Sequence, residues 1–212
     1  MVTLEAILER NNLNRAYKQV KANRGGPGVD GMTVDELSDY LRAHAVEIVE
    51  TVKAGKFKPQ PVRRVMIPKE EKGKFRPLGI PAVDRVIQQV IAQKLSDEYE
   101  PVFSLHSHGF RPCRSCRTAI DEALDIANQG YVWVVDLDLS KFFDTVNHSK
   151  LLQLLSDKLK DGRVVSLIHK ILRAPIQEGD KITPCEIGTP QGGPVSPVLA
   201  NIMLNELDHE LE

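Results

Sequence analysis

Apolar residues recur three or four positions apart along much of the chain, which is the spacing of amphipathic helices. The pattern begins with Leu4, Ile7 and Leu8 and continues to Val20. Thr33, with a glutamate three residues later, fits a capping box, and the glycine at position 55 can end the helix that follows. The spacing predicts helices over residues 4–20, 33–54, 81–95, 115–128, 149–160, 164–173 and 195–211.

Three stretches have the composition of strands instead. The first, "PVRRVMIPKEEKGKFRPLGIP" at 61–81, has two β-rich arms around a charged turn that contains Gly73, so it predicts a hairpin. A second hairpin is expected across "EGDK" at 178–181. The third, "YVWVVDLDL" at 131–139, is typical of a buried strand. Helices mixed with short hairpins predict an α+β fold.

The composition fits a soluble chain with a sizeable core. The 212 residues are 42% apolar and 27% charged, enough for one large domain or two small ones. No apolar run approaches the roughly 18–20 residues of a membrane span, and "MVTLEAILERNN" lacks the features of a signal peptide. We therefore expect a cytoplasmic protein with no membrane partner. The last predicted helix is still running at Glu212, which indicates a chain cut from something longer.

The charge is unevenly distributed, although the net charge is only −1. Residues 53–85 hold ten Lys/Arg against three acidic residues, a net of +7, and residues 10–24 hold five basic residues and no acid. This asymmetry favours a surface that binds a polyanion such as nucleic acid. Two solvated basic surfaces would produce the same pattern. If the surface is real, we expect RNA contacts from Arg15, Lys18, Lys21, Arg24, Arg63 and Arg111.

Aspartates punctuate the predicted strand at 131–139 and the turn after it. Alternation places Asp136 and Asp138 on one face, with Asp138 where the strand leaves the sheet, and Asp144 follows in the turn. A hard cation such as Mg²⁺ binds through carboxylates of this kind. Two aspartates alone are a weak signal, because such a pair is more often simply polar residues at a strand end.

Two further stretches suit the binding of a triphosphate. Lys69 and Arg76 lie seven residues apart across the predicted hairpin turn, so opposite arms can present a point charge and a guanidinium fork to one phosphate group. In "GTPQGGPVSP", Gly192 and Gly193 permit close backbone approach, and Gln191 offers an amide. Taken singly, these are also compatible with a charged hairpin tip and an ordinary loop.

The cysteines and histidines carry weaker signals. "CRSC", with Cys113 and Cys116, has zinc-like spacing, and Cys185 with a histidine can complete four ligands. The alternative is two reduced thiols at a helix start. "HSH" at 106–108 is poor evidence for a metal pair, and His148 fits a helix start.

Four ordered blocks resemble the reverse transcriptases encoded by group II introns, the maturases. They are "IPKEEKGKFRPLGIPAVDRVIQQ", "HGFRP", "VVDLDLSKFFDTVNH" and "GTPQGGPVSPVLANIMLNELD". The resemblance runs from about Asn12 to the end of the chain. "NRGGPGVDGMT" also resembles the N-terminal extension that distinguishes these enzymes from retroviral ones.

The resemblance implies a right-hand polymerase that copies RNA into DNA with two Mg²⁺ ions. It implies fingers with the N-terminal extension at 1–88, a first part of the palm at 89–145, a second part of the fingers at 146–195 and a palm helix at 196–212. Asp138 would be the first catalytic carboxylate, with the carbonyl of Leu139 as a further metal ligand. Lys69, Arg76 and Gln191 would contact the triphosphate, and Phe143 would exclude a ribose 2′-hydroxyl. Asp136 and Asp144 would be structural.

The family's other two metal carboxylates lie in a Tyr-Ala-Asp-Asp hairpin that these 212 residues do not contain. We therefore expect the chain by itself to bind metal poorly and to lack polymerase activity. The expected partners are intron RNA, an RNA template, a DNA primer and deoxynucleoside triphosphates, with possible self-association through uncovered apolar surface. Two alternatives are an RNA-binding maturase module without polymerase activity, and another bacterial reverse transcriptase from a retron or a CRISPR-associated system.

Overall fold

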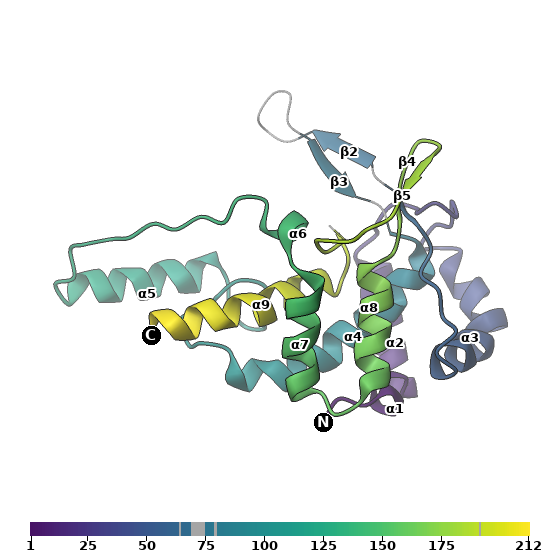
Figure 1. Ribbon diagram of the computed structural model, residues 1–212, viewed down its shortest axis with the longest axis horizontal. Coiled ribbons are helices and arrows are strands. Elements are labelled where there is room, and N and C mark those ends of the chain that lie inside the picture. The colour runs from purple at the N-terminus through teal and green to yellow at the C-terminus, as the bar shows by residue number, and fades with distance from the viewer. Residues whose placement is uncertain (64, 69–74, 79, 191) are drawn as a thin grey trace.

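The computed structural model describes residues 1–63, 65–68, 75–78, 80–190 and 192–212. Helices make up most of this part of the chain, as the apolar spacing predicts (Figure 1). In chain order the helices are α1 Leu4–Ile7, α2 Arg10–Ala22, α3 Leu37–Lys53, α4 Ala82–Tyr99, the 3₁₀-helix η1 Glu100–Val102, α5 Cys116–Asn128, α6 Phe142–Thr145, α7 His148–Lys158, α8 Gly162–Leu172 and α9 Ser196–Leu211.

Both predicted hairpins are present in the described residues. The strands are β1 Val62–Arg63, β2 Val65–Pro68, β3 Phe75–Leu78, β4 Ile176–Glu178 and β5 Lys181–Thr183. β2 and β3 pair antiparallel, and β4 pairs antiparallel with β5 and parallel with β1. Because β1 immediately precedes β2, this parallel pair joins the bases of the two hairpins. The expected α+β class is confirmed.

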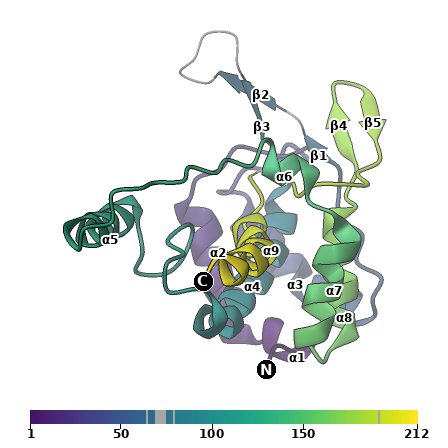
Figure 2. The same cartoon turned by 60° about the vertical axis from the view of Figure 1, so that its left-hand side comes forward.

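Helix α4 forms the centre of the core. The side chains of Val86, Val90, Ile91 and Leu95 are buried, and α1, α2 and α9 all pack against this helix. Helices α7 and α8 lie side by side on the same core, as both views show (Figures 1 and 2). Because α4 is covered on several sides, its buried residues are not confined to one apolar stripe and include the polar side chains of Asp84, Arg85 and Gln88.

Local signals in the sequence set several helix ends. The backbone N–H of Thr33 donates to the Glu36 carboxylate at 2.9 Å, and the Glu36 N–H donates to Thr33 Oγ1 at 3.4 Å, which is the predicted capping box. Gly55, with φ of 65°, follows the last turn of α3, where a left-handed residue commonly ends a helix. Asp161 caps α8 and also accepts from the N–H of Leu4 at 2.9 Å, which attaches the N-terminus to this helix.

The segment 131–139 is not the buried strand that its composition predicts. It runs as extended chain between α5 and α6, apart from the helical body (Figures 1 and 2). Its apolar side chains are exposed: Trp133 is 94% exposed and Val135 is 84% exposed. A strand forms only when a neighbouring backbone accepts and donates its hydrogen bonds, and no described strand pairs with this segment.

None of the helices that the structure describes combines the length and the apolar character that crossing a membrane would require.

Candidate functional site

The short helix α6 is fastened to the loop before α9 by backbone hydrogen bonds. The N–H of Thr189 donates to the carbonyl of Phe143 at 2.7 Å, and the N–H of Gly188 donates to the carbonyl of Val146 at 2.9 Å. The buried His148 donates from Nε2 to the Gly188 carbonyl at 2.6 Å. Two stretches about forty residues apart in the sequence therefore form one unit, and it contains Phe143.

Gly188 is required at the point of closest approach. Its φ is 88°, a left-handed conformation that favours glycine, and a Cβ there would lie 2.9 Å from the carbonyl oxygens of both Phe143 and Asp144. Backbone atoms cannot move aside as a flexible side chain can. The first glycine of "GTPQGG" thus permits the contact between α6 and the loop.

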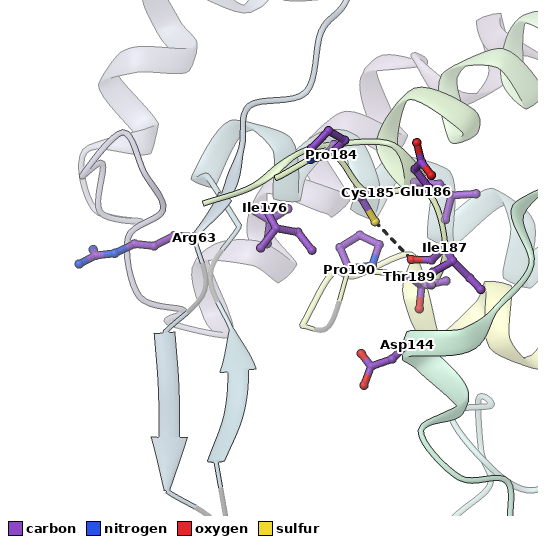
Figure 3. Close-up of a pocket in the computed structure, with 13 residues that line it drawn as sticks. Arg63, Asp144, Ile176, Pro184, Cys185, Glu186, Ile187, Thr189 and Pro190 are labelled. Atoms are coloured by element: carbon purple, nitrogen blue, oxygen red, sulfur yellow. Dashed lines mark hydrogen bonds between the residues drawn. The ribbon is translucent and has the colours of Figure 1, made fainter. Parts of the chain in front are cut away.

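A pocket of about 290 Å³ lies beside this junction (Figure 3). Its walls come from β1, β4, α6 and residues 184–190, which meet here although they are distant in the sequence. Asp144 projects from α6 beside Pro190, whereas Arg63 points away from Pro190 on the far side (Figure 3). The Sγ atom of Cys185 donates to the carbonyl of Ile187 at 3.4 Å and so helps to shape the loop.

The first two turns of α4 hold three other segments through buried polar side chains. Asp84 accepts from the N–H of Gln60 at 2.7 Å, and Arg85 Nη2 donates to the carbonyl of Gly26 at 2.7 Å. Gln88 lies under the loop before α9, because a Cβ on Gly193 would come within 2.4 Å of its Oε1 atom. Among the described residues, Gln88 Oε1 has no hydrogen-bond partner.

The glycines of "NRGGPGVDG" fit this arrangement. A Cβ on Gly25 would lie 2.1 Å from Arg85 Nη1, and one on Gly28 would lie 2.5 Å from backbone atoms of Pro81. The loop therefore lies directly on the start of α4. Asp84, Arg85 and Gln88 were missed as site residues, because a polar residue within an apolar helical pattern carries no local signal of what it contacts.

Burial makes the stability of this region depend on pH. Desolvation raises the pKa of Asp84 to about 7, although the hydrogen bond from the Gln60 N–H opposes the shift. In the unfolded chain the carboxyl titrates near its ordinary value of about 3.9. Between these values the folded state holds more protons than the unfolded state, so the free energy of unfolding falls as pH rises from about 4 to 7.

We expect the variant Asp84→Asn to remove this dependence, because the amide is neutral and its oxygen can still accept from Gln60. At pH 8 its free energy of unfolding should exceed that of the wild type by roughly 1–4 kcal/mol, with little difference near pH 4. Denaturant unfolding at both pH values measures this. The exposed Asp125→Asn is the matched control and should show no such divergence. If Asp84→Asn is no more stable than the wild type at pH 8, the inference that ionised Asp84 destabilises the folded state is wrong.

Of the predicted triphosphate contacts, Lys69 and Gln191 lie outside the described residues. Arg76 is in β3, where its backbone pairs with Ile67 of β2. The observed register therefore places Arg76 on the second arm of the hairpin and gives no position for Lys69. The convergence of these residues on one pocket stays a prediction.

The predicted metal ligands lie on the extended segment before α6. Asp136 and Asp138 are exposed, and Leu139 is 50% exposed. Among the residues that the structure describes, no three His, Cys, Asp or Glu side chains are placed to hold a metal ion. The described residues therefore do not assemble a Mg²⁺ site, and Asp138 would be one ligand of a larger set.

The expected RNA-binding residues fall into two groups. Arg15, Lys18, Lys21 and Arg24 are exposed on α2 and just after it, and Arg63 is exposed on β1. Arg111 is different, because its side chain is only 3% exposed. Its guanidinium forms a fork on Glu100, with Nη2 to Oε1 at 2.9 Å, and Nη1 also donates to the Ser107 carbonyl at 2.8 Å.

The guanidinium of Arg111 also lies 5.3 Å from the ring centroid of Phe103. Its donors are thus taken up by the fold, and this arrangement does not support an RNA contact.

The cysteines and the "HSH" histidines also have structural surroundings. Cys113 and Cys116 are exposed beside the start of α5, as expected of thiols at a helix start, whereas Cys185 is buried. His108 contacts Thr118 at 2.9 Å and Glu122 at 2.7 Å, and His106 also contacts Glu122. These contacts join α5 to the preceding loop.

Known proteins resemble this chain over most of its length. A group II intron-encoded protein, LtrA of Lactococcus lactis subsp. cremoris, is 40% identical over 194 residues, which is 91% of this chain and 32% of LtrA. Protein YkfC of Escherichia coli is 38% identical over 98% of this chain and 56% of its own length. The chain thus spans between a third and just over half of these relatives.

A solved structure shares the fold. A chain of the "Partial Cas6-RT-Cas1--Cas2 complex" matches with a TM-score of 0.64 at 22% identity, over 98% of this chain and 34% of that one. Residues 67–212 match the family described as reverse transcriptase (RNA-dependent DNA polymerase). That match includes the β2–β3 hairpin from Ile67 onward, the aspartate segment, α6 and the loop fastened to it, and it shows that the chain belongs to the reverse transcriptase family.

Proposed function

We propose that this chain is the fingers and first palm region of a group II intron reverse transcriptase, which copies RNA into DNA and assists its intron RNA in splicing and mobility. One observation supports this most directly. The α6 turn with Phe143 is fastened by hydrogen bonds to the loop that leads to Gln191. The fold thereby brings Phe143 beside Thr189, two residues before the proposed nucleotide contact Gln191, which itself lies outside the described residues.

The roles follow from chemistry and position. Lys69, predicted on the first arm of the hairpin, and Arg76 on β3 would hold the phosphates of a deoxynucleoside triphosphate. Gln191 would lie under its sugar, and the ring of Phe143 would fill the space that a 2′-hydroxyl needs. Phe143 is supported by edge contacts with Phe110 and Phe142, at centroid distances of 6.4 and 6.0 Å.

Magnesium is the ion that this family's chemistry implies, and bound Mg²⁺ ions would neutralise charge on the transferred phosphoryl group. Asp138 and the Leu139 carbonyl are proposed as the ligands from this part of the protein. The described residues do not complete a site for the ion.

The ring of Phe143 provides a direct test of the proposed function. The variant Phe143→Ala, made in the protein expressed from its complete open reading frame, should still extend a DNA primer on an RNA template. It should also incorporate ribonucleotides more readily relative to deoxyribonucleotides, by about tenfold or more, since a steric exclusion worth roughly 1–3 kcal/mol is removed.

Single-nucleotide extension with matched ribo- and deoxyribonucleotide pairs measures the ratio. Tyr40→Ala, which removes an exposed ring on α3, is the control and should leave sugar discrimination near the wild-type value. If Phe143→Ala discriminates as the wild type does, Phe143 does not contact the sugar. If the wild type makes no DNA on RNA, the polymerase assignment itself is wrong.

A second candidate is an RNA-binding maturase module without polymerase activity. The observation in its favour is the exposed cationic surface of α2 and the residues after it, Arg15, Lys18, Lys21 and Arg24, which needs no active site. A further relative, Nuclear intron maturase 1, mitochondrial, of Arabidopsis thaliana, is 30% identical over 139 residues. RNA binding without primer extension by the complete protein would favour this candidate.

A further inference from the structure

A groove lies between the segment after α3 and the C-terminal half of α8. Figures 1 and 2 show this segment running beside α8. The groove has a volume of about 710 Å³ and is lined by Gly55, Lys56, Phe57, Lys58, Pro59, His169, Lys170, Arg173, Ala174 and Pro175. We propose that this basic groove binds the phosphodiester backbone of single-stranded RNA. The proposal deepens the proposed function, because it names a second surface at which the protein holds RNA.

The first wall is shaped by the end of α3. The N–H of Lys56 donates to the Thr51 carbonyl at 2.9 Å, and the N–H of Gly55 donates to the Val52 carbonyl at 3.0 Å, which together close a Schellman motif. After this turn Phe57 is buried in the core, whereas Lys56 and Lys58 are exposed on either side of it. The alternation of burial directs both lysines away from the core.

The second wall is the last turn of α8 and the residue after it. Ile168, Ile171 and Leu172 are buried, so His169, Lys170 and Arg173 stand on the other side of the helix, at the three- and four-residue spacing of one face. Lys170 donates through Nζ to the carbonyl of Gly55 and so joins the two walls. The separation of the walls is therefore fixed by the fold.

The cations of the groove are not neutralised within the part of the chain that the structure describes. There, no carboxylate forms an ion pair with Lys56, Lys58 or Arg173, whereas the nearby Lys53 pairs with Glu50 at 3.0 Å and Arg163 pairs with Glu5 at 2.8 Å. Favourable interaction with a helix dipole explains basic residues in the last turn of α8. It does not explain Lys56 and Lys58, which lie beyond the end of α3.

The lining chemistry favours phosphates over bases. Lysine and arginine provide donors without acceptors, which suits phosphate oxygens. Of the two rings in the lining, Phe57 is 8% exposed and offers no face for a base to stack on, and His169 is a single exposed imidazole. The groove should therefore bind RNA with little sequence preference and with strong dependence on salt.

The test uses a labelled single-stranded RNA of mixed sequence and fluorescence anisotropy at several salt concentrations. The groove variant is Lys56→Gln with Lys58→Gln and Arg173→Gln; Lys170 is kept because of its contact with Gly55. Its affinity should fall by at least about tenfold near 0.1 M salt, and the slope of log affinity against log salt should become less steep by about 2, since each phosphate contact on a single strand contributes roughly 0.7.

The control variant, Arg117→Gln with Lys150→Gln and Lys160→Gln, removes the same charge from exposed positions outside the groove. It should keep nearly the wild-type affinity and slope. If the two variants bind RNA equally well, the proposal is overturned. Thermal melting verifies folding, and if the triple variant unfolds, Arg173→Gln alone should reduce the slope by about 0.7.

Two further binding measurements identify the ligand. The first uses a DNA strand of the same sequence. If the groove variant loses affinity for DNA and RNA alike, the groove recognises the phosphodiester backbone; if it loses affinity for RNA only, the groove recognises RNA specifically. The same measurement with polyglutamate tests for an acidic protein ligand. If the protein binds polyglutamate as tightly as RNA, and the groove variant lowers that affinity as well, the groove is a site for acidic protein and the proposal is overturned. Primer extension by the wild type is measured separately, so failure of the polymerase assignment is distinguishable from failure of the groove.

Discussion

Replacing Asp138 with alanine, in the protein expressed from its complete open reading frame, is expected to lower primer extension on an RNA template by about 10²- to 10³-fold. Asp138 is exposed near the end of the extended segment, four residues before α6. A short carboxylate next to the turn that carries Phe143 is well placed to serve a metal beside a bound nucleotide. The variant should melt at nearly the wild-type temperature, because an exposed side chain contributes little to stability.

The matched control is Asp136→Ala. Asp136 lies two residues earlier on the same exposed segment, so it loses the same charge while its proposed role is structural. We expect a much smaller loss of activity from this variant. Near-normal extension by Asp138→Ala, or an equal loss from both variants, would show that Asp138 is not the catalytic carboxylate. Single-turnover extension with saturating nucleotide separates a loss of chemistry from a loss of primer–template affinity.

The helices were predictable because their signals are local. A stripe of apolar residues and a cap are both read within one stretch of chain, and α7, α8 and α9 begin and end within two residues of their predicted bounds. Helix α4 extends four residues past its predicted end, to Tyr99. Tyr99 is buried four residues after Leu95, so the buried face of α4 continues to its end, where the chain passes directly into η1.

The segment 131–139 shows why strands are harder to predict. Its valines and tryptophan have the composition of a buried strand, yet they are exposed, because pairing depends on a second stretch of backbone that composition does not specify. In the β2–β3 hairpin the partner is supplied by the same short stretch of sequence. The hairpin there could therefore be inferred from one stretch of sequence, whereas its register, with Ile67 opposite Arg76, is a finding of the structure.

The site was predictable only where residue type alone implied chemistry. An exposed arginine and a buried one look identical in sequence, and Arg111 is bound by Glu100 and two backbone carbonyls rather than left for RNA. Conversely, His169 and Arg173 become part of the proposed RNA-binding groove only because α8 lies beside Lys56 and Lys58. The charge count along the sequence finds one wall, because Lys56 and Lys58 lie in the basic stretch 53–85, but it does not connect it with the other wall, which is more than a hundred residues away.

The second large effect is expected at Gly188. The variant Gly188→Ala would adopt a left-handed conformation at a cost of about 1–2 kcal/mol, and its Cβ would also collide with the carbonyl oxygens of Phe143 and Asp144 at 2.9 Å. To relieve the collision, the loop must separate from α6 and lose the hydrogen bonds of Gly188, Thr189 and His148. We expect a lower melting temperature and a loss of primer extension of about tenfold or more, as misplacement near a reacting group produces.

Gly179→Ala isolates the contribution of this contact. Gly179 also has a positive φ, of 59°, but no described atom lies within 4 Å of the position its Cβ would take. Gly179→Ala therefore has the free-energy cost of the left-handed conformation without the collision. Residue 179 lies in the β4–β5 turn and not beside Phe143. Thermal melting and primer extension of both variants should therefore differ, with Gly188→Ala the more impaired in each. Equal behaviour would mean that the close approach of the loop to α6 does not position the proposed nucleotide site.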